Sequence, residues 1–189
     1  MSTDGVDESH VKVWLILGPS GVGKSDFGGW LHTELNWLHL EIDRSDGDGI
    51  DLNALRPEWD AFLKQNNAQP FRTRLEHAKI SAALTFASNF VLNVDQIAAA
   101  KQAGIETVYL YGSAAHCIDR FLSREHETGR NLTVEHWLHN NERQYMEISK
   151  PAFARYRVHV FAHTGDRLQH REVFETILKN KSNAGRCRH

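Results

Sequence analysis

One eight-residue segment near the start of the chain restricts its possible folds more than any other feature. Residues 18–25 read GPSGVGKS, which satisfies the pattern G-x-x-x-x-G-K-[ST] in full. The preceding run, residues 11–17, is short, apolar and β-branched, which predicts a buried strand. The following residues, 24–35, predict a helix. A glycine-rich loop between a buried strand and a helix is the arrangement that this pattern requires.

Each part of the pattern suits the binding of phosphate groups. Glycines let the backbone curl until successive amides point at one anion, and the next helix adds its unpaired amides and positive dipole end. Lys24 can reach the β- and γ-phosphates, and Ser25 can ligate Mg²⁺. We therefore predict a site for a nucleoside triphosphate, ATP, together with Mg²⁺. The predicted nucleotide ligands of the loop are Gly18, Pro19, Ser20, Gly21, Val22, Gly23, Lys24 and Ser25.

Composition limits the class of protein without naming a partner. The chain has 189 residues, of which 41% are hydrophobic, which suits a single globular domain spanning residues 1–189. Its 22 basic and 24 acidic residues nearly balance, so we expect neither nucleic acid nor a membrane as a partner. Two cysteines suit a reducing cytoplasm, and no apolar run is long enough for a spanning helix, so a cytoplasmic protein is expected. We also expect a monomer or weak homodimer. Residues 1–10 and 179–189 are expected to be disordered tails.

Strand and helix patterns alternate along the rest of the chain. The residues predict further strands at 37–43, 90–94, 105–111 and 158–162, and helices at 57–65, 71–87, 97–103, 114–125, from 133, and 168–178. Gly28 and Gly29 inside the first helix are expected to let it pack closely on the sheet. The pattern predicts a three-layer α/β fold with a five-stranded, mainly parallel sheet, a helical substrate region and a lid.

Two carboxylates close the second predicted strand. Glu41 and Asp43 are two positions apart, so their side chains share one face of that strand. With the phosphate-binding loop, they make the chain resemble small P-loop kinases, most closely the shikimate kinase-like group. The resemblance implies that Asp43 orients or deprotonates the acceptor hydroxyl, and that Glu41 holds Mg²⁺ or its waters. The alternative is a pair of ordinary solvated acids at a strand end.

The predicted substrate region resembles that group less closely. Phe71, Arg72 and Glu76 are similar to its Phe-Arg…Glu pattern, but with one additional residue between Arg and Glu. The resemblance implies that Arg72, or Arg74 in its place, grips an anionic group of the substrate. An arginine on a solvated helix face is the alternative. The next predicted strand lacks the Gly-Gly-Gly turn of shikimate kinases, so shikimate itself is not favoured as the acceptor.

That strand is similar instead to a strand end of guanylate kinases, which implies that Asp95 holds a Mg²⁺-bound water. The Arg- and Tyr-rich guanine-binding pattern of those enzymes is missing between Asp43 and Phe90, so a guanylate kinase is not predicted. Further along, Arg120 and Arg124 lie four apart on one helix face. The resemblance implies that one of them packs near the adenine. An exposed helix face is again the alternative.

Residues 127–132 are polar and are predicted to form a mobile lid. Arg130 occupies approximately the place of the lid arginine of the group, and Gly129 could serve as a pivot. Phosphoryl transfer needs such a cation because charge spreads over the equatorial oxygens of the phosphoryl group.

Together these residues predict an ATP-dependent phosphotransferase that acts on a small polar metabolite, with Lys24, Asp43 and Arg130 as catalytic residues. A nucleoside or nucleotide kinase, and a non-catalytic ATP-binding regulatory protein, remain alternatives. A nucleotide-hydrolysing switch is less favoured because no guanine-specificity motif is present.

Overall fold

A computed structural model describes residues 11–41, 56–76, 81–86 and 90–186 of the chain. Its described strands form one five-stranded sheet in the order β2-β3-β1-β4-β5, and every neighbouring pair is parallel. The strands are β1 (Val13–Leu17), β2 (Leu38–Glu41), β3 (Ala82–Thr85), β4 (Ile105–Tyr111) and β5 (Arg157–His159). The predicted fold class, a parallel sheet with helices on both faces, is therefore confirmed.

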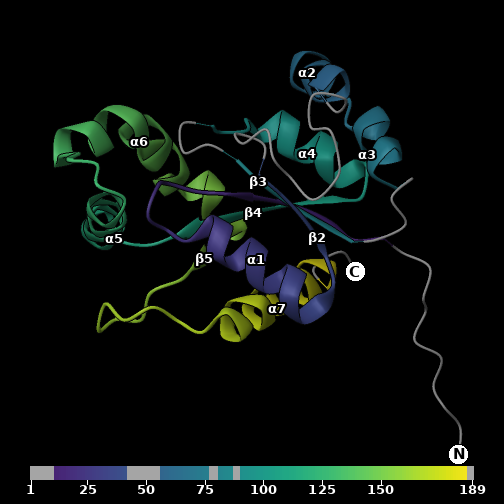
Figure 1. Ribbon diagram of the computed structural model, residues 1–189. Coiled ribbons are helices and arrows are strands. Elements are labelled where there is room, and N and C mark those ends of the chain that lie inside the picture. The colour runs from purple at the N-terminus through teal and green to yellow at the C-terminus, as the bar shows by residue number, and fades with distance from the viewer. Residues whose placement is uncertain (1–10, 42–55, 77–80, 87–89, 187–189) are drawn as a thin grey trace, which may run out of the picture.

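Helices cover the two faces of this sheet (Figure 1). On one face lie α1 (Lys24–Leu35) and α7 (His170–Arg186), and on the other lie α2 (Arg56–Gln65), α3 (Gln69–Glu76) and α4 (Val94–Gln102). Two more helices, α5 (Ala114–Glu127) and α6 (Val134–Ser149), lie beside the loop that joins β1 to α1, and a short 3₁₀ helix, η2 (Pro151–Tyr156), precedes β5. This third group of helices reaches the carboxyl edge of the sheet, where ligands bind in open α/β folds.

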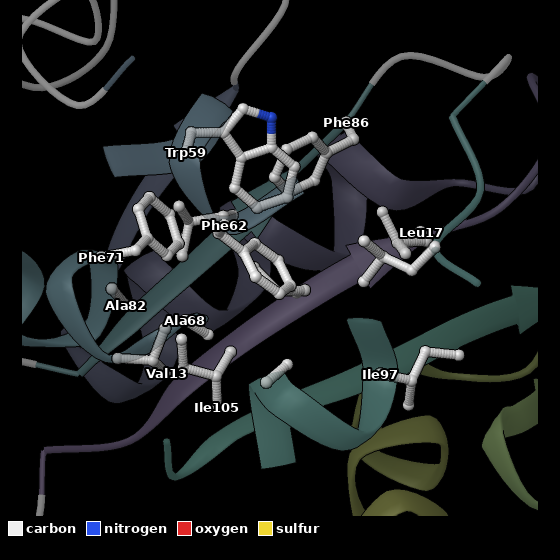
Figure 2. Close-up of a cluster of buried hydrophobic side chains, with 14 of the residues drawn as sticks. Val13, Leu17, Trp59, Phe62, Ala68, Phe71, Ala82, Phe86, Ile97 and Ile105 are labelled. Atoms are coloured by element: carbon white, nitrogen blue, oxygen red, sulfur yellow. The ribbon is translucent and has the colours of Figure 1, made fainter. Parts of the chain in front are cut away.

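The central strand β1 is buried on both faces because its side chains alternate between two cores. Val13, Leu15 and Leu17 pack into the core under α2, α3 and α4, whereas Trp14 and Ile16 pack against α1 and α7. Figure 2 shows the first core, with an aromatic group formed by Trp59, Phe62, Phe71 and Phe86. A strand covered on both faces reads as a continuous apolar run, which is why residues 11–17 were recognisable.

The third strand differs from the prediction. Residues 71–87 were expected to be helical and residues 90–94 to be the strand, but α3 ends at Glu76 and β3 is Ala82–Thr85. Alanine favours helices, yet this segment is wholly buried between β1 and β2, and such packing overrides intrinsic propensity. Residues 90–93 lead into α4 instead. Asn93 caps that helix by accepting from the Gln96 amide (2.9 Å), while the Gln96 side chain accepts from the Asn93 N–H (2.9 Å).

The C-terminal segment also differs from the prediction. The helix α7 continues to Arg186, so most of the tail expected at residues 179–189 is helical. Residues 1–10 lie outside the described part of the chain. Among the described helices, none is both long and apolar enough to cross a membrane.

The two glycines inside α1 have different surroundings, which gives a matched pair of substitutions. A methyl group at Gly28 would collide with the His39 ring of β2, and that ring is held by Thr85 Oγ1 (3.3 Å). A methyl group at Gly29 would meet no atom within 4 Å. We expect Gly28→Ala to lower the free energy of unfolding by about 1–3 kcal/mol. Gly29→Ala is expected to raise it by up to about 1 kcal/mol because alanine is the better helix former. Urea denaturation of both variants measures the difference; equal effects would contradict the packing described here.

Candidate nucleotide and phosphotransfer site

The loop formed by residues 18–25 joins the carboxyl end of β1 to the first turn of α1. Gly21 and Gly23 both have left-handed backbone conformations, with φ of 82° and 91°. A side chain at Gly21 would also collide with the backbone of α5 at Cys117, and one at Gly23 with the guanidinium of Arg167. Both positions therefore favour glycine for conformation, and Gly21 requires it for close packing as well, because its neighbours are backbone atoms.

The lysine of the motif lies over this loop. Lys24 Nζ donates to the carbonyl oxygens of Gly18 (2.8 Å) and Pro19 (3.1 Å). Ser25 follows in the first turn of α1, with an exposed side chain. A cation and a hydroxyl therefore stand together at the positive end of a helix, which is an arrangement that favours phosphate.

A cleft of about 810 Å³ opens above the loop. This volume falls in the range of small-molecule sites. Nine of the predicted site residues line it: Ser20, Gly21, Gly23, Lys24, Ser25, Glu41, Arg120, Arg124 and Arg130. The other three residues of the loop, Gly18, Pro19 and Val22, are buried and do not line the cleft. Asp43 lies outside the described residues, so its assignment stays a prediction.

Two arginines of the cleft share one buried carboxylate. Glu125 is only 2% exposed at its side chain; its Oε1 accepts from Arg124 (2.6 and 3.0 Å), and its Oε2 lies 2.7 Å from Arg130 Nη2. The contact with Arg130 is an ion pair by distance, although its angle does not meet hydrogen-bond geometry. The arginine side chains themselves are 56% and 63% exposed, so each extends from its buried anchor toward the open cleft. Glu125 thereby gathers two cations at the side of the cleft formed by α5.

The link that carries Arg130 is more ordered than a free lid. The amides of Gly129 and Arg130 donate to carbonyl oxygens of α5, at His126 (2.9 Å) and Glu125 (2.8 Å), and Gly129 has a left-handed φ of 75°. These bonds continue the end of α5 by two residues. The mobility of residues 127–132 stays a prediction.

A further arginine, Arg167, holds the start of α1. Its guanidinium donates to Asp26 Oδ2 (2.6 Å) and to the carbonyl oxygen of Gly23 (3.2 Å). Burial acts to raise the pKa of Asp26, but the hydrogen bond and charge of Arg167, with the charge of Arg120, outweigh it, so this pKa lies below its usual value. Asp26 therefore stays ionised beside the cleft, where it fixes Arg167 against the loop.

Across the cleft, β2 and β3 end side by side. Glu41 of β2 is in register with Thr85 of β3, and both line the cleft together with Phe86. Phe86 stacks on Trp59 of α2, with ring centroids 4.5 Å apart, so an aromatic group backs this wall. The carboxylate and the aromatic wall thus lie at the end of the cleft formed by β2 and β3, whereas the arginines lie on α5 and the link after it.

Apart from Gly18, Pro19 and Val22 of the loop, three predicted residues in the described part of the chain do not line the cleft: Arg72, Arg74 and Asp95. Arg72 is buried and donates to Glu76 (2.9 Å) and to the carbonyl oxygen of Val11. Val11 precedes β1, whereas the phosphate-binding loop follows it, roughly 20 Å further along an extended strand. Arg72 therefore holds α3 to the chain at the amino end of β1, opposite the end that carries the cleft, and does not bind a substrate there. Its neighbour Arg74 is exposed on the same helix.

The third of these residues is Asp95, which was predicted to end a strand next to β1. It lies instead in the first turn of α4, because the strand beside β1 is Ala82–Thr85. Thr85 and Phe86 occupy the position that the prediction gave to Asp95. The assignment of Asp95 to Mg²⁺ rested on the wrong strand and is therefore withdrawn.

The chemistry of the cleft suits Mg²⁺. Ser25 supplies a hydroxyl oxygen and Glu41 a carboxylate oxygen, which are donors that this ion accepts, and phosphates and waters complete its shell at nucleotide sites. The residues described in the structure contain no cluster of three or more His, Cys, Asp or Glu that could hold a metal ion.

A scan against models of known protein families finds no match, and no curated protein sequence matches the chain. The fold is similar to solved structures of small-molecule kinases. A gluconokinase from Sinorhizobium meliloti 1021 is 17% identical over 92% of this chain and 93% of its own, with a TM-score of 0.47. A shikimate kinase from Acinetobacter baumannii, in complex with shikimate, is 18% identical over 94% and 96%, with a TM-score of 0.49. One from Aquifex aeolicus is 14% identical over 92% and 98%, with a TM-score of 0.48. Identities this low assign no activity to this chain.

Proposed function

We propose that this protein is an ATP-dependent phosphotransferase that phosphorylates a small polar metabolite. One observation carries the proposal: a complete phosphate-binding loop opens into the same cleft as three arginines on one side and a carboxylate on the other. A phosphoryl group passing between two oxygens needs cations around it and an oriented acceptor beside it. The cleft supplies the cations, and it supplies a carboxylate that can orient an acceptor.

The proposal gives each group a role. The amides of the loop and Lys24 hold the β- and γ-phosphates, and Ser25 with Glu41 holds Mg²⁺ or its waters. When bound, Mg²⁺ neutralises phosphate charge. Arg130 stabilises the charge that develops on the transferring group. Asp43, two positions beyond Glu41, orients the acceptor hydroxyl. Arg120 and Arg124 are nucleotide ligands on α5, where they face the cleft.

The aromatic wall supports a small acceptor at the end of the cleft near β3. Phe86, only 4% exposed, contributes a small apolar part of the cleft wall, and Glu41 in the adjacent strand offers a hydrogen-bond acceptor. A molecule with hydroxyl groups and an apolar ring face meets both groups at once. A nucleoside or nucleotide acceptor is the second candidate, because its hydroxyl groups and its base would meet the same carboxylate and apolar wall.

The test is the release of ADP from Mg-ATP in the presence of a panel of acceptors. The panel contains sugars, sugar acids, hydroxylated ring carboxylates, nucleosides and nucleoside monophosphates, with a control that lacks any acceptor. We expect one class to raise ADP release well above the control and to yield a phosphorylated product by mass spectrometry. Tight ATP binding with no phosphorylated product across the panel would favour the alternative, a non-catalytic ATP-binding regulatory protein.

A further inference from the structure

The helix α6 makes two hydrogen bonds to the phosphate-binding loop, and no sequence motif predicts them. Asn141 Oδ1 accepts the backbone N–H of Ser20 (2.7 Å), and Trp137 Nε1 donates to the carbonyl oxygen of Ser20 (2.9 Å). These partners are separated from Ser20 by 121 and 117 residues of sequence. The peptide units before and after Ser20 are therefore both held by one turn of a helix from the second half of the chain.

Both side chains are fixed in place. Asn141 and Trp137 are each 1% exposed. The Asn141 amide group donates from Nδ2 to the Trp137 carbonyl oxygen (2.8 Å), so its Oδ1 must be the atom that faces the Ser20 N–H. The side chains of these two residues, one turn apart on α6, thus bind both the N–H and the carbonyl oxygen of Ser20, and Asn141 is held in place by the Trp137 carbonyl oxygen.

The other side of the same loop segment is held by α5. Gly21, the next residue, lies against the backbone of α5 at Cys117 and Phe121, so closely that a methyl group would not fit. Residues 20 and 21 therefore lie between α5 and α6. The link that carries Arg130 connects these two helices, so both of its ends lead into helices that rest on the phosphate-binding loop.

We infer that Asn141 and Trp137 are positioning residues that hold the phosphate-binding loop in its binding conformation before the nucleotide arrives. This inference rests on the nucleotide-binding part of the function proposed above. A loop that is already ordered loses less conformational entropy when it closes around phosphates, and so it binds them more tightly.

The inference is tested by direct ATP binding to purified variants. Asn141→Ala is expected to raise the Kd for ATP about tenfold, because it removes one buried hydrogen bond to the loop. Trp137→Phe keeps an aromatic ring and removes only the N–H, and is expected to raise the Kd about threefold to fivefold. Since both bonds hold the same residue, the double variant should lose less than the product of the two single effects.

Gln144→Ala is the matched control. Gln144 is also 1% exposed on α6, but its amide donates to the Phe90 carbonyl oxygen and not to the loop. It is expected to lower the melting temperature about as much as Asn141→Ala while leaving the Kd for ATP within about twofold. If Gln144→Ala weakens ATP binding as much as Asn141→Ala does, α6 merely supports the fold and the inference is wrong.

Hydrogen exchange supplies a readout that needs no nucleotide. Exchange across residues 18–25 should become faster in Asn141→Ala and in Trp137→Phe than in the wild type and Gln144→Ala. If Asn141→Ala does not fold, Trp137→Phe carries both measurements. Unchanged exchange and unchanged Kd in a folded variant would overturn the inference. Wild-type protein that binds no ATP would instead overturn the proposed function, and exchange across the loop would still decide whether α6 orders it.

Discussion

Replacing Lys24 with alanine is expected to raise the Kd for ATP by about 100-fold or more and to reduce phosphoryl transfer below detection. The ammonium group is held over the loop by two carbonyl oxygens and is the cation closest to the bound phosphates in the proposed arrangement. Hydrogen bonds between charged partners contribute about 1.5–3 kcal/mol each, so loss of the lysine removes one or two such contacts. Isothermal titration calorimetry with Mg-ATP measures the change.

The fold should survive this substitution, because Lys24 lies outside both hydrophobic cores. Lys101→Ala is the control for the loss of one positive charge, since Lys101 is exposed in the last turn of α4. It should bind ATP as the wild type does. A folded Lys24→Ala protein with wild-type affinity would show that the cleft does not bind triphosphates through this loop.

The second large effect concerns Arg130. Arg130→Ala is expected to lower the rate of phosphoryl transfer about 10²- to 10³-fold, by analogy with the loss of one charge-stabilising donor from a catalytic site. The affinity for ATP in the absence of acceptor should change by less than about threefold, because this side chain is paired with Glu125 in the open cleft. Single-turnover measurements with the acceptor found in the panel separate the two quantities.

Because Glu125 is paired with two arginines, removal of Arg130 alone should not destabilise the fold. After its removal the buried carboxylate keeps both contacts with Arg124, at 2.6 and 3.0 Å, so no unpaired charge is left inside the protein. Arg74→Ala removes an exposed arginine far from the cleft and serves as the control for net charge. Transfer by Arg130→Ala at the wild-type rate would shift the catalytic role to Arg120 or Arg124, the other arginines of the cleft.

The sequence predicted those parts of the fold that depend on local pattern. The bounds of α1 and β4 are as predicted, because one follows the phosphate-binding motif and the other is an apolar run with a glycine on each side. The strand β3 was not predicted because its four residues, Ala82–Thr85, are too few to give a pattern. Two of them are alanines, which favour helices. Only burial between two neighbouring strands makes that segment extended.

Residues of the site divide in the same way. Lys24 and Ser25 belong to a contiguous motif, so their place in the cleft followed from sequence alone. Arg167 and Asn141 did not, because their partners Asp26 and Ser20 lie 141 and 121 residues away, and no local signal marks such a pair. Glu125 is a third example: in sequence it is one more acid in a polar helix, and its burial between two arginines is visible only in three dimensions.

The surroundings of Gly21 and Gly23 limit the substitutions that this chain can accept during evolution. A larger residue at Gly21 would collide with the backbone of α5, and one at Gly23 would be strained by its left-handed φ of 91°, whether or not a nucleotide is bound, so selection for a folded protein already favours both glycines. Ser25 has no such constraint, since its side chain is exposed in the cleft. A descendant that lost catalysis would retain the glycines and drift at Ser25. In a mutational scan, tolerance at Ser25 compared with intolerance at Gly21 would therefore separate selection for activity from selection for structure.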